Sequence, residues 1–397
     1  MKKYLFLFVS ITLFSSFAEA SGDKHKITMP ADQRVVYLAS SPVDSTFISS
    51  SENKQLILWD SKTGRALKEL HTGGDQYFLK EAAFSYDGRL LLTNSWDKKI
   101  KLWDMKTGKV IKTFSGQSEV GALAFSHDGN SFLAGHDSTG DVELWNIKSG
   151  KMERTIPGPK SDNQVVSTLV EFSPDDQAFL VSHSYLNSKE KYSFLEYMED
   201  VFPSTYQQPI TLYQKDSGEV LNQAKVYSDY GYAPRVAFSP EGDSFYSIFF
   251  GAGIKQWDSV TGEKMKKMIH SGGHPDLVTA MKISPDGRFV VVGKKDHSVE
   301  IWDVAKKKEV KRFSRKIITK DIKSPLSVLS ADGQTLIAWD HQQKSINLYP
   351  TGLSDLQQQE KKSKTEKGPL KRLVERFMAK PGYANLSATS CSSLTEE

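Results

Sequence analysis

A short alternating segment with an aromatic residue at its fourth position recurs seven times, and this repeat constrains the fold more than any other feature. Its copies include LILWD, IKLWD, VELWN and VEIWD, and the aromatic positions are Trp59, Trp103, Trp145, Tyr213, Trp257, Trp302 and Tyr349. Successive aromatic residues lie 44, 42, 68, 44, 45 and 47 positions apart, so only the fourth unit is longer than the rest. A unit of this size cannot bury both faces of a sheet alone, so the units must pack against one another.

Two further elements keep the same phase as the aromatic segment. One is an apolar strand that enters a turn, as in FSYDG (84–88), FSHDG (125–129), FSPEG (238–242) and LSADG (329–333). The other is a Thr-Gly or Ser-Gly pair just after the aromatic segment, followed by an alternating strand. Aspartate bonds nearby backbone and glycine accepts positive φ, so both elements predict tight hairpins. Each unit therefore contains four short strands, which predicts an all-β fold of seven four-stranded blades around an axis.

At this point the chain resembles the WD-repeat family. The resemblance covers Lys24 to about Gly352, within a predicted propeller domain of residues 21–352. It implies a seven-bladed β-propeller, with the repeat aromatic residues packed between blades, and a rigid protein-binding platform rather than an enzyme. Within the family's polar blade network, Asp97 and Asp296 stand at the aspartate position and His274 at the histidine position. The match departs from the family pattern in several respects. Five of the seven copies have tryptophan, and only four of those have the aspartate that follows it. The Gly-His pair that usually opens a repeat occurs once, at residues 273–274.

The two ends of the repeat region predict how the ring closes. The last unit has three convincing strands, up to Tyr349, and lacks a fourth. A spare strand, from His25 to Pro30, precedes the first unit. Placing this spare strand on the last blade would complete that blade and remove an open sheet edge.

The N-terminal segment has the pattern of a secretory signal peptide spanning residues 1–20. Lys2 and Lys3 precede a mostly apolar run from Tyr4 to Phe14, and Ala18 and Ala20 supply small residues for cleavage. The alternative is an uncleaved anchor, but the run is shorter than the roughly 20 residues that span a bilayer. We therefore expect a periplasmic or secreted protein, cleaved near Ala20, with no transmembrane span remaining.

Residues 353–397 form a charged tail. Within it, residues 369–380 contain Leu370, Leu373, Val374 and Phe377 at helical spacing, which predicts a short amphipathic helix. This helix could dock on the propeller, or it could make weak contact with a membrane surface or a partner. Beyond it, we expect a disordered, Ser- and Thr-rich end.

The sequence contains no motif for a catalytic centre, a cofactor or a metal site. It lacks nucleophile-elbow, zinc-protease and phosphate-loop patterns, and the lone Cys391 cannot form a disulfide within the chain. The formal net charge of +4 is too small to predict nucleic-acid binding. We therefore expect a non-enzymatic protein without a cofactor, and we expect it to be a monomer.

The fourth unit carries an insertion at residues 187–208, between its second and third strands. Tyr192, Leu195, Met198 and Phe202 recur there at helical spacing, which predicts a short amphipathic helix on the loop face of the ring. It could cap the central channel or a neighbouring blade, or it could contact a partner. Trp96 and Trp339 lie out of phase with the repeat aromatic residues, and we place both in loops between second and third strands. Large aromatic side chains on exposed loops are candidate binding hot spots. Either tryptophan could instead pack inward, and the sequence does not decide between the two.

These features predict an exported scaffold that binds a protein or peptide through the loop face. Two alternatives remain at this stage. One is a periplasmic propeller of envelope transport, which shares the Ser-Pro-Asp-Gly turns. The other is a propeller enzyme that uses a metal or quinone in its channel.

Overall fold

The computed structural model is all-β in the part of the chain that it describes. Contacts divide the chain into two units, Met1–Thr351 and Gly352–Glu397. The described residues all belong to the first unit: 27–30, 34–71, 79–116, 118–159, 164–186, 206–228, 235–249, 253–269, 278–283, 289–294, 299–304, 306–313, 327–340 and 344–351. The predicted tail helix at 369–380 and the signal segment therefore lie outside them.

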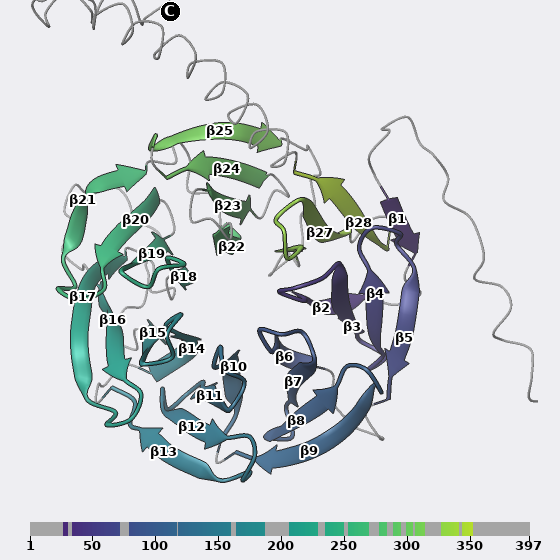
Figure 1. The fold of residues 1–397 in the computed structure, drawn as a ribbon, viewed down its shortest axis with the longest axis horizontal. Helices are drawn as coiled ribbons and strands as arrows, with labels where there is room; N and C mark the ends of the chain where they lie inside the picture. The colour runs from purple at the N-terminus through teal and green to yellow at the C-terminus, as the bar shows by residue number, and fades with distance from the viewer. Residues whose placement is uncertain are drawn as a thin grey trace, which may run out of the picture. The chain divides into compact units, whose positions relative to one another are not determined.

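Seven four-stranded antiparallel sheets stand around a common axis and form the blades of a propeller (Figure 1). Blade 1 consists of β2 (Val35–Ser40), β3 (Thr46–Ser51), β4 (Leu56–Asp60) and β5 (Ala66–Leu70). Blade 2 consists of β6 (Leu79–Phe84), β7 (Leu90–Ser95), β8 (Lys99–Asp104) and β9 (Lys109–Ser115). Blade 3 consists of β10 (Val120–Phe125), β11 (Ser131–His136), β12 (Val142–Asn146) and β13 (Met152–Ile156). Blade 4 consists of β14 (Gln164–Phe172), β15 (Ala178–Leu186), β16 (Tyr206–Gln214) and β17 (Val220–Ser228). Blade 5 consists of β18 (Arg235–Phe238), β19 (Ser244–Phe249), β20 (Gly253–Asp258) and β21 (Lys264–Ile269). Blade 6 consists of β22 (Val278–Ile283), β23 (Phe289–Lys294), β24 (Val299–Asp303) and β25 (Lys308–Phe313). The predicted seven-bladed propeller is confirmed.

Blade 7 is completed by the N-terminal strand, as the sequence predicts. It contains β26 (Ser327–Leu329), β27 (Thr335–Asp340), β28 (Ser345–Pro350) and, as its outermost strand, β1 (Ile27–Pro30). β1 runs antiparallel to β28, with Ile27 opposite Leu348 and Pro30 opposite Ser345. Because strands from both ends of the repeat region share one sheet, hydrogen bonds lock the ring closed.

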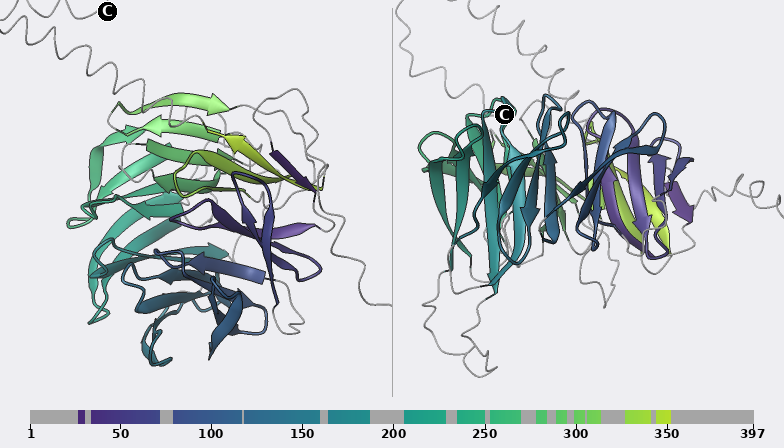
Figure 2. Two further views of the ribbon diagram at one scale, coloured as in Figure 1. Left: turned by 45° about the vertical axis from the view of Figure 1, so that its right-hand side comes forward. Right: turned by 90° about the horizontal axis from the view of Figure 1, so that it is seen from below.

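The ring has two distinct faces. Antiparallel strands place the loops between second and third strands, and the loops between blades, on one face, which we call the loop face. The turns between first and second strands, and between third and fourth strands, lie on the opposite face, which we call the turn face (Figure 2).

The hydrophobic core is divided among the seams between neighbouring blades. In the described residues, six buried clusters each draw side chains from two adjacent blades. The repeat aromatic residues also pack within their own blades, each against a side chain directly opposite on the second strand. Phe47 stacks on Trp59, Phe132 on Trp145 and Phe245 on Trp257, with ring centroids 6.0 to 6.4 Å apart. Such cross-strand aromatic pairs stabilise a sheet beyond the area that they bury.

The turns on the turn face are held by their own polar side chains. In blade 2, the Ser85 hydroxyl donates to Asp87 and accepts from the Leu90 amide, while Asp87 also accepts from the Arg89 amide. The Ser85 hydroxyl, with the Arg89 amide, lowers the pKa of Asp87. Gly88 closes the turn at φ 70°, a conformation that glycine adopts without steric cost. The sequence motif therefore forms the hairpin that it predicts.

A repeated side-chain latch, which sequence reasoning missed, joins the outer strands of successive blades. Lys68 on β5 donates to the Lys106 carbonyl of blade 2, 2.7 Å away, and Lys112 on β9 donates to carbonyls of blade 3. Arg154 and Asn222 repeat the contact onto blades 4 and 5. The latch side chain lies over the glycine of the next blade's Thr-Gly or Ser-Gly turn, where a Cβ on Gly108 would meet the Lys68 side chain at 2.5 Å.

Blade 4 is longer than the other blades, which corrects the predicted bounds of its insertion. Each of its four strands has nine residues, and β16 begins at Tyr206, so residues 206–208 are strand rather than insertion. Longer hairpins therefore account for part of the extra length. Tyr192, Leu195, Met198 and Phe202 lie outside the described residues, and the predicted helix there stays a prediction.

Candidate binding face

Trp96 lies on the loop face, in the loop between β7 and β8, as the sequence predicts. Its side chain is 44% exposed, and the Lys80 ammonium lies 4.5 Å from the centre of its ring. A cation at this distance from the ring is attracted to the electrons of the indole face. Trp96 therefore presents a large aromatic surface to solvent while a neighbouring side chain supports it.

Lys80 is itself held by carboxylates from the next blade. Its ammonium lies 3.0 Å from Asp137 and 3.5 Å from Glu119, and only 17% of its side chain is exposed. Asp137 also accepts from the Thr168 amide of blade 4. The Asp137 carboxylate lies directly over Gly121, where a Cβ would meet it at 2.0 Å, so a side chain at this position would displace the carboxylate. The position of Trp96 is thus fixed by an ion network that spans blades 2 and 3.

Trp339 is not a loop residue, and this part of the prediction is wrong. It lies within β27, opposite Ile346, and is 4% exposed. It packs in the seam between blades 7 and 1, in a cluster with Val35, Leu38 and Trp59. The corresponding residue of β7 is Asn94 and that of β11 is Gly135, both smaller than tryptophan. Trp339 therefore fills the seam at which the ring closes.

The five repeat tryptophans are buried, and their indole N–H groups find partners in two ways. In blades 1, 2 and 5 the indole donates to a hydroxyl on the second strand: Trp59 to Ser49, Trp103 to Thr93, and Trp257 to Ser247, at 2.7 to 2.8 Å. In blades 3 and 6 it donates to a glutamate two residues earlier on its own strand, from Trp145 to Glu143 and from Trp302 to Glu300.

The residue on the second strand determines which of the two arrangements a blade has. Where the indole bonds a glutamate, the second-strand hydroxyl position holds Ala134 or Val292, neither of which can accept a hydrogen bond. A buried indole N–H without a partner is costly, so the glutamate replaces the missing acceptor. A Glu-x-Trp segment paired with an apolar second strand was the available sequence signal. Tyr213 and Tyr349 are only partly buried, and Tyr213 stacks on Phe179.

Blade 3 builds a polar network without the residues that the family resemblance implies. Glu143 Oε2, which accepts from Trp145, also lies 3.1 Å from His136 Nε2, and both side chains are 1% exposed. His136 Nδ1 lies 2.8 Å from the Ser118 hydroxyl in the loop before β10. The histidine thus comes from the second strand rather than from the entry loop. Asp97 bonds Ser95 and the Lys99 amide within its own loop, while His274 and Asp296 lie outside the described residues.

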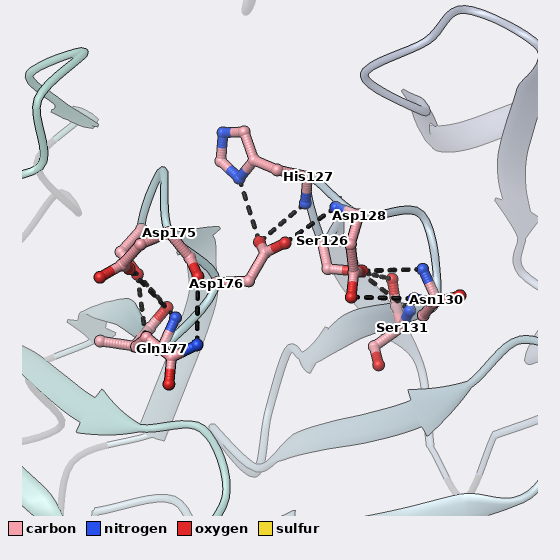
Figure 3. A network of polar contacts seen from close by, with 10 residues as sticks. Ser126, His127, Asp128, Asn130, Ser131, Asp175, Asp176 and Gln177 are labelled. Atoms are coloured by element: carbon pink, nitrogen blue, oxygen red, sulfur yellow. Dashed lines mark hydrogen bonds and ion pairs between the residues drawn. The ribbon is translucent and has the colours of Figure 1, made fainter.

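A second polar cluster lies on the turn face and joins blades 2, 3 and 4. Most repeat turns have proline or alanine at the position held by Tyr86 in blade 2 and by His127 in blade 3. These two rings stack with their centres 3.6 Å apart. Asp176 of blade 4 accepts from the His127 and Asp128 amides at 2.7 and 2.8 Å, and lies 3.1 Å from His127 Nδ1 (Figure 3).

Asp176 occupies a turn position that is glycine in most of the other repeats. Its φ is 57°, which costs a residue with a Cβ about 1–2 kcal/mol relative to glycine. Its side chain is nearly buried, and its three contacts with blade 3 offset that cost. Nearby, burial raises the pKa of Glu171 to about 8, although the carboxylate accepts from the Phe238 amide. Burial, together with Glu171 and Asp176, also raises the pKa of Tyr86. These groups lock neighbouring blades together.

Within the described ranges, no three acidic, histidine or cysteine side chains are grouped so that they could hold a metal ion. His183 on the loop face is buried, its Nε2 bonds the Gly140 carbonyl, and burial lowers its pKa. In the same part of the chain, no helix has the length and apolar character needed to cross a membrane.

Sequence comparison with known proteins agrees with the propeller fold. The WD domain, G-beta repeat, matches residues 68–104, 108–146 and 266–303, which fall on blades 2, 3 and 6 with the preceding outer strands. The chain contains WD repeats and folds into a seven-bladed β-propeller. A guanine nucleotide-binding protein subunit beta of Saccharomyces cerevisiae is 34% identical to this WD-repeat protein over 99 residues. That similarity covers 25% of this chain and 21% of the yeast protein. WD-repeat propellers are typically protein-interaction scaffolds, and the described residues fit that role.

Proposed function

We propose that this WD-repeat protein is an exported scaffold that binds a protein or peptide partner through its loop face, with Trp96 as a principal contact. The supporting observation is an exposed indole, backed by Lys80, on a rigid ring. Aromatic side chains that are held in place before binding lose little entropy on binding, which makes them effective anchors. Residues 187–205, which connect β15 to β16 in the sequence, provide a second candidate contact.

Affinity capture from the protein's own compartment tests the binding surface. Wild-type protein is compared with Trp96→Ala, and with Leu67→Ala as a control, because Leu67 is similarly exposed on the outer strand β5. We expect the specific partner to be reduced at least tenfold with Trp96→Ala and to be unchanged with Leu67→Ala. Equal recovery with both variants would reject Trp96 as a contact.

Replacement of residues 187–205 by a flexible Gly-Ser linker tests the second contact. A linker is needed because β15 pairs with β16 only between Ala178–Ser182 and Ile210–Gln214, so Leu186 and Tyr206 are not paired with each other. The replacement spares β16, whereas one that extended to residue 208 would remove part of that strand. We expect the thermal midpoint to stay near that of wild type while recovery of the partner falls. An unchanged recovery would remove this segment from the binding surface.

The export part of the proposal is supported by the sequence alone, through Lys2, Lys3 and the apolar run up to Phe14. Cell fractionation and N-terminal sequencing of the native protein test it. We expect a mature chain that starts just after Ala20, in the periplasm or the medium. A full-length chain in the cytoplasm would overturn the export part without touching the binding part.

A further inference from the structure

The outermost strand of blade 4 carries fewer charges than the outermost strands of blades 1, 2, 3, 5 and 6. Each propeller blade ends in a strand whose outer edge is open to pairing, and natural proteins discourage such pairing with charged residues. The outer strands β5, β9, β13, β21 and β25 read ALKEL, KVIKTFS, MERTI, KMKKMI and KEVKRF, and each carries two to four charges. β17 reads VLNQAKVYS, with Lys225 as its single charge in nine residues. The outer strand of blade 7, β1, has no charge, but it is only four residues long and ends in Pro30, which cannot donate a backbone hydrogen bond.

β17 is also the longest outer strand, and part of it belongs to an unusual two-stranded ribbon. Tyr206–Pro209 of β16 pairs with Lys225–Ser228 of β17, but β15 pairs with β16 only from Ile210 onward. In the described residues, no third strand extends this ribbon. A two-stranded ribbon is marginally stable alone in water, so an additional strand would stabilise it. Figure 1 shows β17 outermost in its blade.

The start of β17 exposes two adjacent apolar side chains. Val220 is 55% exposed and Leu221 is 53% exposed. In a nine-residue edge with one charge, they add apolar area that a pairing strand could cover. Length, low charge and apolar exposure thus coincide on one edge.

We propose that two copies of this chain associate through β17, antiparallel, so that two blade 4 sheets join into one. A two-fold axis at Ala224 would place Lys225 opposite Gln223 and Leu221 opposite Tyr227, so no like charges would face each other. A second copy supplies an edge of equal length and equally low charge, which the charged outer strands do not. This differs from the monomer expected from sequence and is independent of the loop-face proposal.

The dimer should be weak, because pairing of one strand buries less than the roughly 1,200 Å² of a stable interface. Sedimentation of the purified protein from about 1 to about 200 µM covers the dissociation constants expected for such a contact. We expect a reversible monomer–dimer equilibrium. In hydrogen exchange, β17 amides should become more protected as concentration rises.

Leu221→Lys tests the edge directly, and Leu67→Lys is its matched control, because both leucines are second in an outer strand and about half exposed. A dimer contains the substitution twice, so we expect Leu221→Lys to weaken association at least tenfold and Leu67→Lys to leave it unchanged. Val220→Lys provides a second variant if Leu221→Lys lowers the thermal midpoint. A wild-type monomer at every concentration, or equal effects of the β5 and β17 variants, would overturn the proposal.

Discussion

Replacement of Trp339 by alanine should destabilise the propeller strongly, because the side chain fills the seam where blades 7 and 1 meet. The indole is 4% exposed and lies in a cluster with Val35, Leu38 and Trp59. Removal of a buried tryptophan costs about 3–5 kcal/mol, as lost apolar burial plus the cavity that remains. For a domain of roughly 300 residues, at about 2 cal/mol/K per residue, this corresponds to a thermal midpoint lowered by roughly 5–8 °C.

Trp339→Phe should cost much less than alanine. Within the described residues the indole Nε1 of Trp339 has no hydrogen-bond partner. Phenylalanine removes this buried N–H, whose desolvation costs about 1–3 kcal/mol, while it keeps most of the apolar volume. The two effects oppose each other, so we expect a net change within about 1.5 kcal/mol.

Trp96→Ala is the matched control, since the sequence suggests the same role for both tryptophans. An exposed side chain contributes little to folding, so we expect a change within about 1 kcal/mol. Urea unfolding, with the slope compared between variants, measures all three free energies. If Trp339→Ala and Trp96→Ala differ by less than about 1 kcal/mol, the seam argument is wrong. Trp339→Leu replaces the alanine variant if that one does not fold.

One deletion and substitutions at two positions test other parts of the ring. Deletion of residues 21–31 removes β1 and leaves β28 as an open edge, so we expect a sharply lower thermal midpoint, and an unchanged midpoint would refute closure by β1. Glu171→Gln should flatten the pH dependence of stability: the folded pKa of Glu171 is raised from 4.5 to about 8, so its stabilising effect is complete below pH 4.5 and is lost as pH rises through 8. We therefore expect the glutamine variant to gain stability relative to wild type between pH 5 and pH 9 in thermal scans, and parallel curves would contradict this. Asp176→Ala should be less stable than Asp176→Gly by about 1 kcal/mol, because both variants lose the three carboxylate contacts but only alanine has the cost of positive φ. Equal urea midpoints would show that φ 57° carries no strain.

The sequence predicts most of the architecture because the fold repeats a local pattern. The alternation before each aromatic residue and the Asp-Gly and Thr-Gly turns specify four strands within each unit. Seven copies, together with the spare strand before Pro30, are enough to predict the ring and its closure. These strands and turns can be predicted without the tertiary structure because each depends on residues only a few positions away in the sequence.

The candidate site depends on contacts between blades, and here prediction from sequence was only partly successful. Trp96 and Trp339 look alike in the sequence, but Trp96 lies beyond the end of β7 and Trp339 lies inside β27. A shift of a few residues in where a strand ends decides whether an aromatic ring is exposed or buried. Strand ends are set by the partner strand and by the packing of the seam, so local pattern does not specify them.

Residues far apart in sequence also produce the polar networks that hold the blades in place. Lys80 reaches Asp137, and Asp176 reaches His127, across distances in sequence longer than a repeat unit. The sequence by itself determined the number, order and type of blades, because local hydrogen bonding and hydrophobic alternation specify each strand. Only the tertiary structure decided which aromatic side chain faces solvent and which closes the ring, because burial depends on the neighbouring blade.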